Sequence, residues 1–84
     1  MKVPRYPKVT TVVPAEGRRL LVTFDNDVRK WYDCRPLLQT EAFRLLTQDW
    51  LFRSVRVDAG GYGISWDEQI DLSESELWEH GQVV

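Results

Sequence analysis

Residues 66–78 read Trp66-Asp67-Glu68-Gln69-Ile70-Asp71-Leu72-Ser73-Glu74-Ser75-Glu76-Leu77-Trp78, and this stretch predicts how the fold ends. Ser73 and Glu76 have the Ser-x-x-Glu spacing of a capping box, in which each side chain satisfies a backbone N–H group that a starting helix leaves unpaired. Leu72 and Leu77 occupy the two positions of a hydrophobic staple. Cap and staple therefore agree on one helix that begins after Ser73.

The residues around this helix start predict its end and its neighbours. His80 and Gly81 are typical of a helix C-terminus, where glycine adopts the left-handed conformation at little cost. Trp78 lies about 100° around the helix axis from Leu77, so we expect it at the margin of the buried stripe and partly exposed. Trp66 belongs to an alternating strand pattern, and we expect its large side chain in the core.

The first half of the chain predicts three strands joined by tight turns. Residues 9–13 are all β-branched, and residues 19–24 alternate in the way that a strand with one buried face does. Residues 28–33 supply the third strand. Asp25-Asn26-Asp27 indicates a hairpin, because Asn and Asp tolerate the positive φ angles that tight hairpin turns require.

The length of this hairpin loop decides which side chains share a face of the sheet. A two-residue loop at Asn26-Asp27 would place Val22 opposite Trp31 and Leu21 opposite Tyr32. The side chains then expected on the core side are Leu20, Val22, Phe24 and Trp31. Those expected on the other side are Leu21, Thr23, Lys30 and Tyr32. This second face is only half polar.

The second half of the chain predicts a short helix, a second hairpin and the closing helix. Residues 35–46 have apolar side chains at helical spacing, and residues 52–58 and 62–66 alternate as strands around Asp58-Ala59-Gly60-Gly61. The predicted order is β-β-β-α-β-β-α. Short turns favour antiparallel pairing, so we expect a single small domain over residues 1–84 of the α+β class, with the helices on one face of a mostly antiparallel sheet.

This order and its residue pattern resemble the DUF2442 family, small bacterial proteins that share a domain of unknown function. The resemblance covers nearly the whole chain. It rests on Pro7-Lys8-Val9, Phe24-Asp25-Asn26, Tyr32-Asp33, Pro36-Leu37-Leu38, Phe43, Leu46, Phe52, Val55, Val57, Asp58, Trp66, Asp71-Leu72-Ser73 and Glu76-Leu77. Two segments depart from the pattern: Asp27 stands where such sequences usually have glycine, and residues 68–70 are less glycine-rich or acidic than expected.

The resemblance implies a compact α+β fold, with no established activity, cofactor or catalytic residue. Such proteins resemble either single domains or N-terminal modules beside a helix-turn-helix domain. Some sit beside a second small protein in arrangements that resemble toxin–antitoxin pairs. We expect this chain to stop before any such extension, so DNA binding through a recognition helix of its own is not expected.

Charge is unevenly distributed along the chain, although the net charge is only -2. Residues 1–35 carry eight basic and four acidic side chains, whereas residues 36–84 carry three basic and nine acidic ones. The asymmetry has two interpretations: a basic face for nucleic acid or an acidic partner, or two solvated surfaces that attract each other in the fold. An isoelectric point near 5.3 argues against a dedicated nucleic-acid binder.

Residue types that carry chemistry are scarce. Cys34 is the single cysteine, and its neighbour Asp33 raises the thiol pKa, so we expect a buried filler. His80 is the single histidine and suits a helix end. Asp25, Asp27 and Asp33 lack the spacing of a metal site. We therefore expect no enzyme activity, catalytic residue, metal or cofactor, and a cytoplasmic location, because no disulfide pair, signal peptide or membrane-spanning run is evident.

We expect the function at aromatic and basic side chains on the surface. The candidate interaction surface consists of Leu21, Lys30, Tyr32 and Trp78, because aromatic side chains are enriched at protein interfaces. The expected partner is a protein, either a second copy or a small protein encoded nearby, with no membrane or small-molecule substrate. The alternative is an antitoxin-like regulator that binds nucleic acid with its basic N-terminal strands.

Overall fold

Two antiparallel sheets frame the protein in the computed structural model, which describes residues 6–84. The elements, with η marking a 3₁₀ helix, are β1 (Val9–Ala15), β2 (Arg19–Phe24), β3 (Arg29–Asp33), η1 (Arg35–Gln39), η2 (Glu41–Thr47), α1 (Asp49–Phe52), β4 (Arg56–Val57), η3 (Ala59–Gly61), β5 (Gly63–Ser65), β6 (Asp71–Ser73), α2 (Glu74–His80) and β7 (Gln82–Val83). This confirms the α+β class. Lys2 and Arg5, counted above among the basic side chains, lie outside the described residues.

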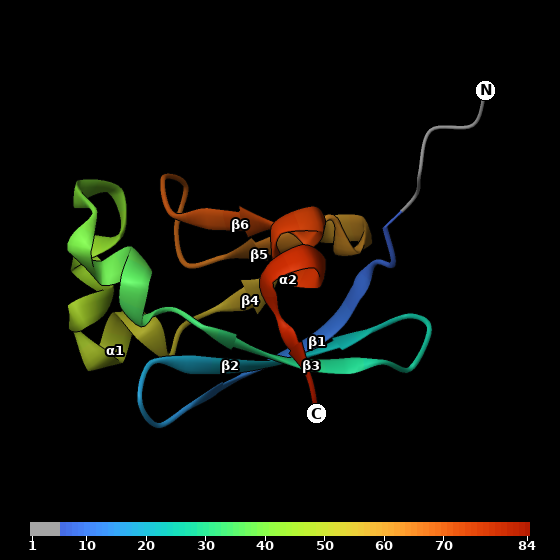
Figure 1. Cartoon of the computed structure of the whole chain (residues 1–84). Coiled ribbons are helices and arrows are strands. Elements are labelled where there is room, and N and C mark those ends of the chain that lie inside the picture. The colour runs from blue at the N-terminus through green and yellow to red at the C-terminus, as the bar shows by residue number, and fades with distance from the viewer. Residues whose placement is uncertain (1–5) are drawn as a thin grey trace.

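The two sheets form separate layers. One has the strand order β1-β2-β3-β7 and the other the order β4-β5-β6. Figure 1 shows the three-stranded sheet and α2 on one side of the four-stranded sheet, with η1, η2 and α1 gathered at one end. The core lies between the layers, and its fully buried side chains include Leu20, Val22, Phe24, Leu46, Phe52, Ile64 and Leu77.

The predicted start of α2 is confirmed. The Ser73 hydroxyl accepts a hydrogen bond from the Glu76 backbone N–H at 3.2 Å, and Leu72 and Leu77 are both buried. The Glu76 side chain has a different role from the one that a capping box assigns to it. Its carboxylate turns to the four-stranded sheet and accepts a hydrogen bond from the Tyr32 hydroxyl at 2.8 Å. The helix start is thus also a tertiary contact.

The predicted left-handed stop at Gly81 is wrong. Gly81 has φ -76° and ψ 157°, because the chain extends directly into β7, which pairs with β3. Glycine is needed there for space: a Cβ would lie 2.5 Å from the Leu77 carbonyl oxygen and 3.0 Å from the Lys30 Cβ. The close approach of α2 to the sheet therefore explains this glycine.

The loop between β2 and β3 has three residues, Asp25-Asn26-Asp27, where two were predicted. The Asp27 backbone N–H donates to the Phe24 carbonyl at 3.0 Å, and the Phe24 N–H donates to the Val28 carbonyl at 2.9 Å. Asp27 itself has φ 67°, the left-handed residue that three-residue hairpin loops place last.

The extra loop residue makes the predicted register wrong by one position. Val22 pairs with Lys30, and Leu21 pairs with Trp31. Because side chains alternate along a strand, a shift of one residue exchanges the two faces of β3. Lys30 and Tyr32 therefore face the core, with exposed fractions of 9% and 4%, and Trp31 faces away from it.

The middle of the chain also differs from its prediction. The expected helix over residues 35–46 is two 3₁₀ helices, because the extended ψ of 148° at Thr40 separates them. Phe52 ends α1, and the strand predicted over residues 52–58 is reduced to β4. The short strands β6 and β7 were not predicted.

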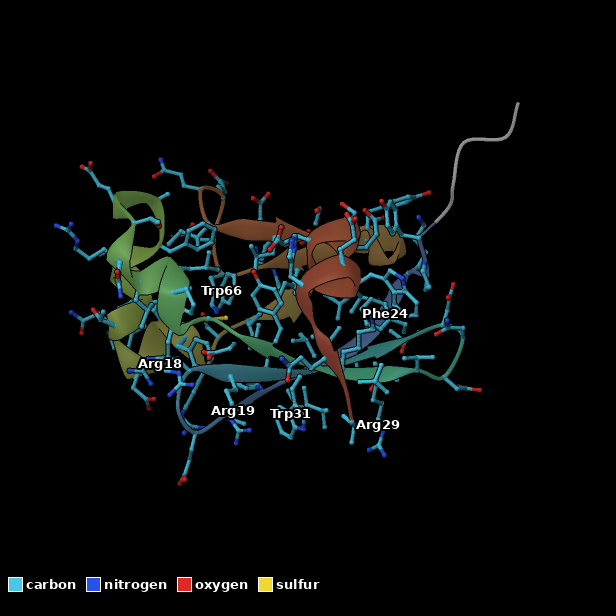
Figure 2. All side chains as sticks on the ribbon, in the orientation of Figure 1. Arg18, Arg19, Phe24, Arg29, Trp31 and Trp66 are labelled. Carbon is cyan, nitrogen blue, oxygen red and sulfur yellow. The ribbon has the colours of Figure 1, made fainter. Side chains whose placement is uncertain are left out.

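Arg18 fastens the irregular helical segment to the sheet. Its Nε donates to the Leu46 carbonyl at 2.9 Å, its Nη2 donates to the Thr47 carbonyl at 2.8 Å, and its Nη1 pairs with Asp49 at 3.1 Å. Figure 2 shows Arg18 at this end of the molecule. One side chain thus satisfies carbonyl groups that the end of η2 leaves unpaired.

Trp66 lies in the core, as predicted. It is 3% exposed, its indole N–H donates to the Phe52 carbonyl at 3.0 Å, and its ring stacks on the Phe52 ring at 6.4 Å. The buried polar atom is therefore satisfied, which is what a tryptophan inside a small core requires.

Candidate binding surface on the four-stranded sheet

Alternate side chains of the four-stranded sheet point away from the core and form the surface that we call the outer face. By register and alternation its members are Thr11, Val13, Ala15, Arg19, Leu21, Thr23, Arg29, Trp31, Asp33 and Gln82. Figure 2 shows Arg19, Trp31 and Arg29 on the side of the sheet opposite α2. In Figure 1 no helix or strand of residues 6–84 covers this face.

An apolar row crosses the outer face between two arginines. Val13 pairs with Leu21, which in turn pairs with Trp31, so the three side chains are cross-strand neighbours. Val13 is 52% exposed, and the other two are partly exposed. Arg19 and Arg29 flank this row, and neither forms an ion pair with another described residue.

Arg19 and Trp31 form a cation–π pair. The guanidinium carbon lies 4.5 Å from the centroid of the Trp31 ring, and the Arg19 Nε donates to the Glu16 carbonyl at 3.3 Å. An exposed contact of this type is worth about 0.5–1 kcal/mol. It orients the indole while the positive charge stays at the surface.

A pocket of about 280 Å³ opens beside Trp31, where β2 and β3 meet the end of α2. Its walls are formed by Arg19, Trp31, Asp33, Arg35, His80 and Gln82. Arg35 donates to both carboxylate oxygens of Asp33, with its Nη2 at 2.8 Å, and this hydrogen bonding lowers the pKa of Asp33. The single carboxylate of the pocket wall is therefore ionised and already engaged.

Two of the four predicted surface residues serve the interior. The Lys30 ammonium donates to the Trp78 carbonyl and lies 3.8 Å from the Trp78 ring centroid. Tyr32 donates to Glu76, and burial, followed by this hydrogen bond, raises the pKa of Tyr32 far above its usual value. Neither side chain is available to a partner in this conformation.

Trp78 is half-buried, as predicted, but its contacts are with the fold. Its ring meets the Phe24 ring edge-on, with centroids 5.0 Å apart and an interplanar angle of 84°. With Lys30 on its face, it closes the core between α2 and the sheet. Of the predicted contact residues, Leu21 alone faces outward.

Folding absorbs part of the charge asymmetry. Lys8 pairs with Glu74 at 3.0 Å, and Arg18 pairs with Asp49 at 3.1 Å, so oppositely charged halves of the chain do attract each other. Arg19 and Arg29 lie outside these pairs, on the outer face. Mutual attraction within the fold therefore explains Lys8 and Arg18, whereas Arg19 and Arg29 form the exposed basic part of the outer face.

Comparison with known proteins identifies the family. Residues 9–82 match the family model described as "Protein of unknown function (DUF2442)". The chain belongs to the DUF2442 family. No curated protein and no solved structure matched it. Membership in the DUF2442 family therefore accounts for the residue pattern noted above, and it assigns no activity.

The residue types that carry chemistry occupy ordinary structural positions in this DUF2442 domain. Cys34 is buried, and burial, with a contribution from Asp33, raises the pKa of its thiol to about 12. The His80 Nδ1 lies 3.1 Å from Glu76. Within residues 6–84, no three His, Cys, Asp or Glu side chains gather as metal ligands would. Likewise, no helix in this part of the chain has the length and apolar character needed to cross a membrane.

Sequence reasoning missed the exposed aromatic residues of the DUF2442 domain. Trp31 was assigned to the core because of the register error, and Arg19 and Arg29 were not selected. Trp50 on α1 is the most exposed of the large apolar side chains within residues 6–84, at 72%. The one signal in the sequence was Asp27, which occupies the left-handed position of a longer loop.

Proposed function

We propose that this DUF2442 domain is a non-enzymatic binding module that holds a small protein partner against its outer face. The observation that carries the proposal is the row of Val13, Leu21 and Trp31, an apolar strip across three strands that no described element covers. Exposed apolar patches with a polar rim mark interaction sites. Trp and Arg are also the residue types most enriched among the side chains that dominate binding energy.

Charge indicates the chemistry of the partner. Arg19 and Arg29 flank the apolar row without an ion-pair partner among residues 6–84, so a surface that carries carboxylates would complement them. A small acidic protein encoded nearby fits this requirement, in a cytoplasmic arrangement like that of toxin–antitoxin pairs. A second copy of the domain is the other source of carboxylates, because its segment from β5 to α2 carries Asp67, Glu68, Asp71 and Glu79, all at least partly exposed.

Affinity capture from the native cell tests the proposal, together with light scattering after gel filtration. We expect the wild type to hold one protein at a fixed stoichiometry. Leu21→Asp should weaken that complex at least tenfold, because burying an unpaired carboxylate costs more than about 1.4 kcal/mol. Trp50→Ala removes an exposed tryptophan outside the outer face and should leave the complex intact.

Two outcomes would count against this function. One is a strict monomer that captures nothing. The other is a complex that Leu21→Asp leaves unchanged while circular dichroism shows the variant to be folded. In addition, a complex that is lost in Trp50→Ala would contradict the placement of the contact on the outer face and move it to the helical end of the molecule.

A second candidate, binding of single-stranded nucleic acid, is favoured by one arrangement on the same face. Trp31 lies between Arg19 and Arg29, which combines a stacking surface with two phosphate-binding charges. Two phosphate contacts predict that affinity falls about sevenfold between 50 and 200 mM salt. Fluorescence anisotropy of labelled 20-nucleotide strands measures this, and no binding at 50 mM salt would exclude the candidate.

A further inference from the structure

We propose that the pocket beside Trp31 binds a carboxylate group, supplied by an acidic side chain of the protein partner. The inference deepens the proposed function and rests on it for the source of the carboxylate. The pocket itself can be tested without the partner.

The position and size of the pocket suit one side chain. It adjoins the apolar row, because Trp31 belongs to both, so a segment lying on the outer face would pass its mouth. Its volume of about 280 Å³ is at or below the lower end of the range for sites that hold whole metabolites. A terminal group on a larger molecule fits better than a free ligand does.

The walls offer hydrogen-bond donors for an oxyanion. Arg35 uses its Nε and Nη2 on Asp33, which leaves its Nη1 without a partner among residues 6–84. Arg19 uses its Nε on the Glu16 carbonyl, and neither of its Nη atoms has a partner in this part of the chain. Guanidinium groups match the geometry of carboxylates and phosphates, and these donors remain charged at every relevant pH.

The charge count selects a single negative charge. Arg19 and Arg35 contribute two positive charges, and Asp33 contributes one negative charge, so the walls carry a net charge of +1 when His80 is neutral. The Glu76 carboxylate, 3.1 Å from the His80 Nδ1, is not one of these wall residues and already accepts a hydrogen bond from the Tyr32 hydroxyl. A carboxylate neutralises the +1 charge of the walls, whereas a phosphate dianion would leave a net charge of −1 beside Asp33. Trp31 also provides an apolar part of the wall for the methylene groups that carry a glutamate carboxylate.

Nuclear magnetic resonance titration of the full chain tests the pocket directly. There are three probes. The first is glutamate with an acetylated amino group and an amidated α-carboxyl group, so that only its side-chain carboxylate is charged. The others are glutamine blocked in the same way and inorganic phosphate. We expect saturable shifts of the Trp31 indole N–H and of the Arg19 and Arg35 Nε–H signals with the glutamate probe alone. Phosphate binding more tightly than the glutamate probe would overturn the assignment of a carboxylate.

Variants separate a binding site from an unspecific charge effect. Arg35→Gln should weaken the glutamate probe about tenfold or more, because it removes a charged hydrogen bond. Asp33→Asn should tighten it severalfold, because it removes the competing carboxylate and frees Arg35. Damage to the fold would not produce that gain. Arg29→Gln lies on the same face outside the pocket and should change nothing.

The carboxylate pocket and the proposed function can be overturned separately. A glutamate probe that gives no saturable shift, or the same shift as the glutamine probe, overturns the pocket even if Leu21→Asp abolishes partner capture. Conversely, a pocket that binds the probe in a protein with no partner on its outer face would leave the site standing and remove the proposed source of the carboxylate.

Discussion

The two faces of the four-stranded sheet differ in a way that residue type alone does not predict. The inner face holds Lys30 and Tyr32, whose polar ends reach Trp78 and Glu76 on α2. The outer face exposes Trp31, with Arg19 laid on its ring. A lysine is thus buried and a tryptophan faces solvent, because register decides the side on which each residue of β3 stands. The comparison shows that polar side chains can hold α2 against the sheet while an apolar side chain of the same strand faces solvent.

The largest effect should follow from a change on the inner face. Phe24→Ala removes a fully buried ring and its edge-on contact with Trp78, so the free energy of unfolding should fall by about 3–5 kcal/mol. A domain of this length has only about 4–12 kcal/mol in total, so the variant should be marginal. Urea unfolding followed by fluorescence measures the loss. A loss below about 1 kcal/mol would contradict the packing described here.

Substitutions at two neighbouring residues of β3 compare how much each face of the sheet contributes to stability. Lys30→Ala should cost roughly 2–3 kcal/mol, because it removes the buried alkyl chain and the charged hydrogen bond to the Trp78 carbonyl. Arg29→Ala, one residue away on the outer face, should change stability by about 0.5 kcal/mol or less. The same urea experiment compares them. Equal losses would break the distinction between the faces.

Alkaline pH should weaken the inner face through Tyr32. Its pKa is raised by burial and then by the hydrogen bond to Glu76, so the unfolded chain loses the phenol proton before the folded protein does. The pKa shift of Tyr32 contributes fully to the free energy of unfolding below about pH 10, the pKa of tyrosine in the unfolded chain, and this contribution is lost as pH rises above that value. Cys34, with its pKa raised to about 12, acts in the same direction. We expect Tyr32→Phe to cost about 1 kcal/mol at pH 8 and less at pH 11, measured by urea unfolding. If Tyr32→Phe lowered the free energy of unfolding by the same amount at pH 8 and pH 11, the raised pKa of Tyr32 would be contradicted.

The turn that sets the register should give the smallest effect. Asp27 has φ 67°, which glycine adopts with less strain, so Asp27→Gly should raise the free energy of unfolding by about 0.5 kcal/mol. Asp25→Gly, in the same loop and without a positive φ, is the control and should give no gain. Thermal unfolding resolves the difference. A gain from Asp25→Gly that matched the gain from Asp27→Gly would remove the explanation.

The sequence predicted the parts of this fold that depend on local chemistry. The Ser73 cap, the buried Trp66 and the alternation of residues 19–24 follow from neighbours a few positions apart, and all three are present. Register depends on one loop residue, and counting Asp25 in the strand instead of in the loop exchanged the faces of β3. The strands β6 and β7 span three and two residues, too few for a periodic pattern, and tertiary pairing alone stabilises them.

The candidate surface was harder to predict than the fold for the same reason. Leu21 was placed correctly because it lies on β2, whose faces follow from its own alternation. Lys30 and Tyr32 were misplaced with β3, and Trp78 gained its inward role from Lys30 across the interface with α2. The pocket beside Trp31 joins segments that are far apart in sequence, so no local pattern could indicate it.

Site-specific photo-crosslinking in the native cell tests the central claim, that the outer face is the contact surface. A photoreactive amino acid at Val13 would project from the apolar row, and the same group at Trp50, which is 72% exposed against 52% for Val13, would project from α1 as the control. We predict a discrete crosslinked species from position 13, with the mass of one partner or of a second copy, and none from position 50. A crosslink from position 50 alone, or from neither position, would contradict the account.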